Sequence, residues 1–279
     1  MKRTNGELKL LFRKKRNGQT YLSKQFYVLP LQITVPYYQD NDGTAFLNPL
    51  NMGGGVMGED HLRTEIELEE NSQVLFTNLS ATKIFKSHED EYSLLENEFT
   101  VGKDAQFEYL PDYCIPYEEA DVEQKTIIRL KESSYLFAVD HITPGRVSSG
   151  EQFAYRRYMT DFKLYIEDRL AAIERADIRP NQMDLTRIGM LGEYRDYVTV
   201  FIYCDHIGED YMAVLRALMA EQMSGERNSN CGCSLIEKNL VTVKMLGDSN
   251  IAMRKAVDKV WRLSREMLLG KPGVRLRKT

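Results

Sequence analysis

The sequence is poor in the residues that most often build catalytic metal centres and disulfide frameworks. Its 279 residues include four histidines, four cysteines and one tryptophan. So few histidines leave little material for a catalytic metal centre built from imidazole ligands. So few cysteines in a chain of this length do not make a disulfide framework, which predicts reduced thiols and a cytoplasmic setting.

An excess of positive charge and long hydrophobic runs are absent as well. Lys and Arg together number 37 against 41 Asp and Glu, and the formal net charge of -4 gives no electrostatic attraction to nucleic acid. No stretch approaches the ~18 consecutive apolar residues of a membrane-spanning helix, and the N-terminal residues lack the apolar core of a secretory signal. We therefore expect a cytoplasmic protein that binds neither nucleic acid nor membrane.

What the chain does contain is a long region in which apolar and polar residues alternate. Such a period of two is typical of half-buried strands, and dipeptides such as Asn17-Gly18 and Asp42-Gly43 supply turns between them. The pattern extends over residues 1–203. Within it, residues 159–175 allow either two strands or a strand followed by a helix.

The last third of the chain changes to helical spacing. Residues 208–222 and 248–272 each place apolar side chains on one helical face, and the second segment has capping residues at both ends. A strand at 240–246 is predicted between them. We expect a single domain over residues 1–279, with a strand-rich part at 1–203 and an appendage of helix, strand and helix at 204–279.

A glycine-rich stretch, NMGGGVMGED, interrupts the strands at residues 51–60. It lacks the lysine of a phosphate-binding loop, and a strand pattern follows it where a dinucleotide-binding motif requires a helix. One interpretation is a turn whose glycines permit positive φ and close backbone approach. The other is that the glycines turn Glu59 and Asp60 toward an ion or a partner. The glycines concerned are Gly53, Gly54, Gly55 and Gly58.

Three further groups have residue types suited to chemistry. Cys204 with His206, and the pair Cys231 and Cys233 in a predicted polar loop, could each bind a borderline divalent metal weakly. Asp140 and His141 could form half of a hydrolase triad, although no nucleophile motif surrounds a serine or cysteine. The alternative for each group is structural: a strand end, a polar loop and a buried polar network.

Six segments resemble, in order and over nearly the full length, the motif series of the urease accessory protein D family, also called UreH. They are GELKLLFRKKRNGQTYL, NPLNMGGGVMGEDHL, FTNLSATKIFKS, FEYLPDYCIPY, TPGRVSSGEQF and VWRLSREMLLGKP. The most specific features are the glycine run closing in Asp60, the stretch 77–83, the segment 108–111, and the pair Gly145-Arg146 and Gly150-Glu151.

This resemblance implies a non-enzymatic factor for urease maturation. It implies a right-handed, β-helix-like stack of short strands, mainly β, with two α-helices in the C-terminal third. Family members bind an F-type accessory protein and through it the G-type GTPase, and the assembly docks on the urease apoprotein to deliver nickel. No tightly bound cofactor is implied, only transient Ni²⁺.

The family's favoured mechanism, an interior route for nickel, implies polar groups along the path. The positions we assign to it are Asp60, Glu59, Thr77, Ser80, Thr82, Glu108, Asp140 and Glu151. Lys83 is expected to pair with a buried carboxylate such as Glu108 or Glu151, and Arg146 to hold a carboxylate by a bidentate contact. A nickel metallochaperone using the Cys and His groups, and a hydrolase using Asp140 and His141, remain the alternatives.

Overall fold

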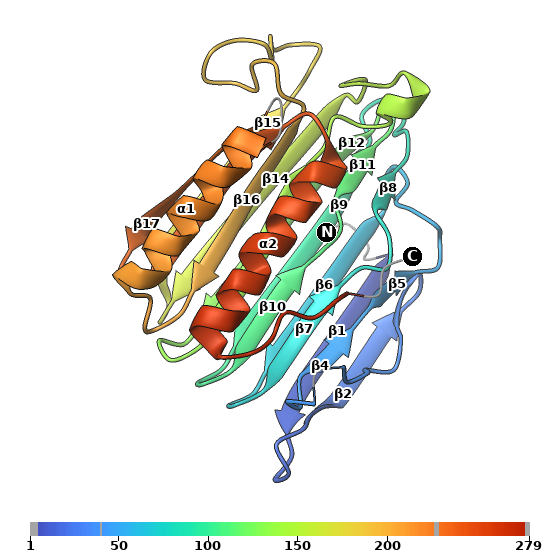
Figure 1. Ribbon diagram of the computed structural model, residues 1–279. Helices are drawn as coiled ribbons and strands as arrows, with labels where there is room; N and C mark the ends of the chain where they lie inside the picture. Colours follow the sequence, from blue (N-terminus) through green and yellow to red (C-terminus); the bar gives the residue numbers. More distant parts are fainter. Residues whose placement is uncertain (1–4, 40, 226–228, 277–279) are drawn as a thin grey trace.

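The chain winds into a β-solenoid of about four turns (Figure 1). The computed structural model describes residues 5–39, 41–225 and 229–276. Most turns place one strand in each of two stacked sheets, so that the chain alternates between them. In the described residues, no helix has the length and apolar character needed to cross a membrane.

The first sheet contains the longest parallel strands. Among the described residues its order is β15 (Arg169–Ile178), β14 (Arg157–Ile166), β12 (Asp121–Leu130), β9 (Ser93–Val101), β6 (His61–Leu68), β1 (Gly6–Lys14) and β2 (Thr20–Val28). The inner five strands are parallel and the two edge strands antiparallel. Leu8, Leu10 and Phe12 show why β1 forms: they alternate with polar residues and are buried between the sheets.

The second sheet lies under the helices. Its order, in the described part of the chain, is β17 (Ser229–Glu237), β18 (Leu240–Gly247), β16 (Asp196–Tyr203), β13 (Tyr135–Ile142), β10 (Gln106–Leu110), β7 (Gln73–Thr77) and β4 (Ala45–Leu47). Every residue of β13 is buried, since one face packs on the first sheet and the other on the helical layer.

Short elements close the ends of the turns. Strand β3 (Leu31–Ile33) pairs with β5 (Pro49–Asn51), and β8 (Thr82–Ile84) pairs with β11 (Cys114–Pro116). A 3₁₀ helix, η1 (Val147–Ser149), follows β13. These elements lie at the end of the solenoid that contains the glycine-rich stretch.

The two helices of the described chain, α1 (Glu209–Gly225) and α2 (Asn250–Leu269), lie side by side over the outer face of the second sheet (Figure 1). Ser249 caps α2 by accepting from the N–H of Ala252, and Gly270 ends it at φ 62. The buried stripe of α2 includes Met253, Val257, Val260, Trp261 and Leu268. The expected strand stack with two C-terminal helices is confirmed.

The structure decides between two open alternatives in one segment and overturns the expectation for another. Residues 159–175 contribute to β14 and β15 and contain no helix, because alternating residues of β14 must cover the interior. The segment around Cys231 and Cys233 is an edge strand, β17, where a polar loop was predicted. A hairpin therefore joins the helices, and β18 pairs with β16 inside the second sheet.

Candidate functional site: a polar cavity between the sheets

A layer of polar residues crosses the otherwise apolar interior of the first sheet. Thr64 on β6, Asn97 on β9 and Thr126 on β12 stand in register on neighbouring strands. The side-chain amide of Asn97 donates to the hydroxyl of Thr126 at 3.3 Å. Parallel in-register strands stack equivalent positions, so one inward polar residue per strand becomes a continuous polar band.

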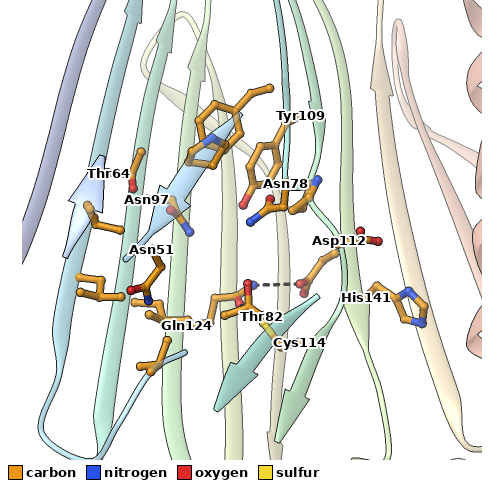
Figure 2. Close-up of a pocket in the computed structure, with 18 of the residues that line it drawn as sticks. Asn51, Thr64, Asn78, Thr82, Asn97, Tyr109, Asp112, Cys114, Gln124 and His141 are labelled. Atoms are coloured by element: carbon orange, nitrogen blue, oxygen red, sulfur yellow. Dashed lines mark hydrogen bonds between the residues drawn. The ribbon is translucent and has the colours of Figure 1, made fainter. Parts of the chain in front are cut away.

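Thr64 and Asn97 of this band line a cavity of about 120 Å³. Figure 2 shows Asn78, Asn97 and Gln124 converging on the same space from both sheets. The polar residues around the cavity are Asn51, Thr64, Asn78, Thr82, Asn97, Tyr109, Asp112, Cys114, Gln124, Asp140 and His141. Apolar side chains such as Val56 and Phe76 complete the wall, so the cavity surface is partly polar and partly hydrophobic.

Asp140, on β13, brings a carboxylate to this interior. It is 5 % exposed and accepts hydrogen bonds from the amide of Gln124 at 3.1 Å and from the hydroxyl of Thr160 at 2.9 Å. Burial raises the pKa of Asp140 above its ordinary value, while these two donors oppose the rise. A cation entering the cavity would relieve the burial penalty of the ionised carboxylate.

Two ionisable groups near Asp140, Cys114 and Tyr109, are kept neutral by burial. Burial raises the pKa of the Cys114 thiol to about 12 and raises the pKa of the Tyr109 hydroxyl as well. Within the described residues, the side-chain oxygen of Asn78, a residue that lines the cavity, is buried without a hydrogen-bond partner. The cavity thus offers a divalent cation the carboxylate of Asp140 and a few neutral oxygens, together with the carboxylate of Asp112, which already pairs with Arg254 at 3.4 Å. Such a donor set binds weakly compared with a cage of several charged ligands.

Some of the residues assigned to the polar interior lie at the cavity, and others lie at the surface. Thr82 and Asp140 line the cavity, and Thr77 is buried nearby with its hydroxyl donating to the carbonyl of Leu110 at 2.7 Å. Ser80 and Lys83 are exposed, contrary to the expectation, because the chain turns outward after β7 and the side chain of Lys83 takes the outer face of β8.

Glu108 is buried but lies on the opposite face of the second sheet from the cavity. Its carboxylate accepts from the indole N–H of Trp261 and from the guanidinium of Arg265, each at 2.7 Å. Neighbouring residues of a strand point to opposite faces, so Phe107 and Tyr109 face the interior while Glu108 faces α2. The assignment of Glu108 to the interior route was therefore wrong.

The glycine-rich stretch forms a tight turn against neighbouring backbone. Gly54 has a φ of 73, and a Cβ on Gly55 would lie 2.9 Å from the carbonyl oxygen of Lys83 and closer still to the ring of Phe85. The Asp60 carboxylate accepts from the N–H of Met57 at 2.9 Å, and Glu59 is exposed. The turn interpretation is confirmed, while a metal role for Glu59 and Asp60 stays a prediction.

Arg146 makes the bidentate contact to a carboxylate that was expected of it, and the carboxylate is that of Glu151. The Nε of Arg146 donates to one carboxylate oxygen at 2.8 Å and a terminal nitrogen donates to the other. The guanidinium lowers the pKa of Glu151 below its ordinary value. Lys83 was expected to pair with Glu108 or Glu151, but arginines occupy both positions.

Asp140 and His141 do not form a catalytic dyad. The carboxylate of Asp140 bonds to Gln124 and Thr160 inside the solenoid, whereas the Nε2 of His141 lies 2.9 Å from the carboxylate of Asp196. Adjacent residues on one strand cannot direct both side chains to the same face. The buried polar network that was the structural alternative is the arrangement found.

The two predicted metal groups differ in geometry. Cys204 and His206 come together with Asp205, and one ligand atom of each lies within 4.8 Å of the others. Cys231 and Cys233 lie on one face of β17 and are partly buried against the helical layer, with the thiol of Cys231 donating to the carbonyl of Met219 at 3.2 Å. These positions do not test whether either group binds a metal ion, so both metal sites stay predictions.

Sequence reasoning missed the amides that shape the cavity. Asn97 interrupts the inward series Leu95, Phe99 and Val101 of β9. Gln124 and Thr126 likewise interrupt the inward series of β12. The usable signal was a polar residue at an inward position in successive strands, but recognising it required the register between strands that are far apart in sequence.

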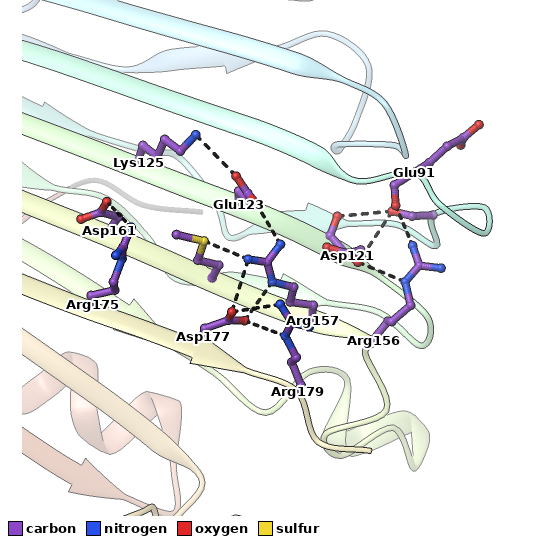
Figure 3. A network of polar contacts seen from close by, with 12 residues as sticks. Glu91, Asp121, Glu123, Lys125, Arg156, Arg157, Asp161, Arg175, Asp177 and Arg179 are labelled. Carbon is purple, nitrogen blue, oxygen red and sulfur yellow. Dashed lines mark hydrogen bonds and ion pairs between the residues drawn. The ribbon is translucent and has the colours of Figure 1, made fainter. Parts of the chain in front are cut away.

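The charged outer face of the first sheet is a different kind of surface. Figure 3 shows Arg157 placed between Glu123 on β12 and Asp177 on β15, with N···O distances of 2.8 Å to each. Arg179 also pairs with Asp177 at 3.1 Å. Because these cations meet carboxylates of the same sheet, the network stabilises neighbouring strands and offers little free positive charge to an anionic ligand.

Comparison with known proteins gives a consistent result. The family model described as "UreD urease accessory protein" matches residues 4–279. A urease accessory protein UreD of Bacillus cereus is 29% identical over 269 residues, 96% of each chain. A UreD of Lachnoclostridium phytofermentans is 30% identical over 262 residues, 93% of each chain. A third, of Herpetosiphon aurantiacus, is 28% identical over 275 residues, covering 97% of this chain and 94% of the relative.

Proposed function

Because the chain belongs to the UreD family of urease accessory proteins, we propose that it serves urease maturation by letting Ni²⁺ pass through the polar cavity between its sheets. The cation is cargo, and the chain itself is not a catalyst. The observation that carries the proposal is the buried Asp140 carboxylate among neutral amides and hydroxyls.

The donor set suits passage better than storage. A conduit must bind an ion strongly enough to replace part of its hydration shell and weakly enough to release it. Asp140 supplies charge, as does Asp112, which pairs with Arg254. Asn78, Asn97 and Gln124 supply or orient neutral oxygens. Apolar walls such as Val56 and Phe76 exclude competing water and strengthen the electrostatic attraction inside.

The proposed partners follow from the family and not from a surface of this chain. An F-type accessory protein, through it the G-type GTPase, and the urease apoprotein would join this chain in the cytoplasm. In such an assembly the chain is a scaffold whose interior connects its neighbours. The stiffness of a stacked sheet suits this role, because a route between partners requires walls that keep their spacing.

The test is the nickel content and activity of the cognate urease, expressed with its F-type and G-type partners. Asn97→Leu fills the cavity with an apolar side chain and Asp140→Asn removes its charge. Both variants are expected to lower nickel content while the partner complex still forms. Thr100→Leu is the matched control, since Thr100 is exposed on the outer face of the same strand as Asn97.

The outcomes separate the conduit from a pure scaffold. If urease needs the chain but tolerates both cavity variants with unchanged nickel content, the chain acts only as a scaffold. If urease acquires nickel equally well without the chain, the maturation role itself is wrong. Nickel loss in the Thr100→Leu control would show that the assay reports general damage to β9.

A further inference from the structure

The loop that joins β16 to α1 brings a thiol, a carboxylate and an imidazole together. Cys204, Asp205 and His206 are consecutive, and the thiol of Cys204 is buried while the other two side chains are exposed. The loop lies against the C-terminal turn of α2, where His206 meets the carbonyl of Leu268. This place is on the helical side of the second sheet, away from the cavity.

Two of the three separations between ligand atoms are close to those imposed by one bound ion, and the third is shorter. The Sγ of Cys204 lies 3.3 Å from the Nδ1 of His206 and 3.8 Å from the Oδ1 of Asp205, and the Nδ1 and Oδ1 atoms are 2.6 Å apart. With metal–ligand bonds of about 2.0–2.3 Å, tetrahedral ligands lie about 3.3–3.6 Å from each other. A small rotation of the exposed Asp205 side chain would lengthen the short separation between its Oδ1 and the Nδ1 of His206.

A second, independent contact fixes which imidazole nitrogen is available. The Nε2 of His206 lies 3.0 Å from the carbonyl oxygen of Leu268. A carbonyl only accepts, so Nε2 carries the hydrogen. Nδ1 lies 2.6 Å from the Oδ1 of Asp205 and is slightly closer than Nε2 to the Sγ of Cys204, at 3.3 Å against 3.5 Å. A backbone carbonyl that holds the far ring nitrogen in this way is the usual outer contact of a metal-binding histidine.

The surroundings favour a cation and hold the loop in place. The C-terminal end of α2 carries the negative end of the helix dipole. Asn239, in the turn between β17 and β18, donates its side-chain amide to the carbonyl of Asp205 at 2.9 Å, and its own carbonyl accepts from the N–H of Cys204 at 3.2 Å. The loop is thus braced by the hairpin and by α2.

We propose that Cys204, Asp205 and His206 bind one borderline divalent cation, of the class of Ni²⁺ or Zn²⁺, with water in the remaining positions. Sulfur, imidazole and carboxylate together match such ions better than they match Mg²⁺ or Ca²⁺. The inference concerns metal binding by this loop alone and does not depend on the role in urease maturation.

The experiment is a titration of the full chain with Ni²⁺, followed by thiolate-to-nickel absorption in the near ultraviolet and by calorimetry. One equivalent with thiolate absorption is expected for the unaltered protein. His206→Ala and Cys204→Ser should each weaken binding by about tenfold or more, and Cys204→Ser should remove the absorption. His88→Ala and Cys231→Ser are controls, because they alter an exposed histidine and a cysteine on β17.

Each outcome decides the question. Binding without thiolate absorption, or absorption that survives Cys204→Ser and disappears in Cys231→Ser, would overturn the site. Unchanged affinity in His206→Ala would do the same. His206 is exposed, so this variant is expected to keep its circular dichroism and thermal transition, and its result holds even if Cys204→Ser fails to fold.

Discussion

The carboxylate of Glu108 on β10 forms an ion pair with the guanidinium of Arg265 on α2, with an N···O distance of 2.7 Å, and both side chains are buried. The Trp261 indole donates to the other carboxylate oxygen. This three-residue contact ties the helical layer to the second sheet across 153 or more residues of sequence. It fixes where α2, and with it the Leu268 carbonyl, lies over the sheet.

Glu108→Gln is expected to destabilise the fold strongly. The amide can keep a hydrogen bond to Trp261 but loses the charge opposite Arg265, and breaking a buried ion pair from one side costs about 3–5 kcal/mol. Denaturant unfolding followed by fluorescence of the single tryptophan measures the loss. Glu237→Gln, in the more exposed pair with Arg169, is the control and should change little. An equally small effect at Glu108 would mean that the ion pair contributes nothing to stability.

Asp140→Asn is expected to raise the free energy of unfolding at neutral pH. The pKa of Asp140 is higher in the folded than in the unfolded chain, so ionising it opposes folding. The penalty is absent below the unfolded pKa, appears as the pH rises toward the folded pKa, and is complete above it. The advantage of Asn over Asp should therefore shrink as the pH is lowered. Urea unfolding of both proteins between pH 4 and pH 8, in steps of about one pH unit, tests this prediction. A difference in unfolding free energy between the two proteins that grows as the pH is lowered would contradict it.

Gly55→Ala is expected to destabilise the glycine-rich turn. The added methyl group would overlap the ring of Phe85 and approach the carbonyl of Lys83, a kind of overpacking that typically costs about 1–3 kcal/mol. Thermal unfolding measures the change. Gly232→Ala is the control, because a Cβ at Gly232 meets nothing within 4 Å. Equal transition temperatures for the two variants would show that the turn accommodates the added methyl group without loss of stability.

The four cysteines should differ in reactivity. Burial raises the pKa of the Cys114 thiol to about 12, and this side chain lies in the interior, whereas Cys231 and Cys233 are only partly buried. Alkylation at about pH 8 should therefore modify Cys231 and Cys233 first and Cys114 only after unfolding. Peptide mass spectrometry at successive times gives the order. Early labelling of Cys114 would mean that the cavity opens readily to reagent.

Much of the fold followed from the sequence by itself. Residue alternation determined most strands, because a strand with one buried face must repeat with a period of two. Ser249, Gly270 and the apolar stripe between them determined α2, because helix ends need capping groups and a helix face needs burial. The glycine-rich turn and the bidentate role of Arg146 followed from local chemistry, although Glu151 as the partner of Arg146 did not.

The tertiary structure alone decided which polar residues meet. Asn97 and Thr126 become neighbours only through strand register, and Glu108 reaches Arg265 only because α2 folds back over the second sheet. Likewise His206 has a defined ring orientation only because the end of α2 supplies a carbonyl. Local sequence determines a residue's conformation and the face of the strand or helix on which it lies. Its partner on that face depends on how distant strands and helices pack together. No local sequence pattern reveals that packing.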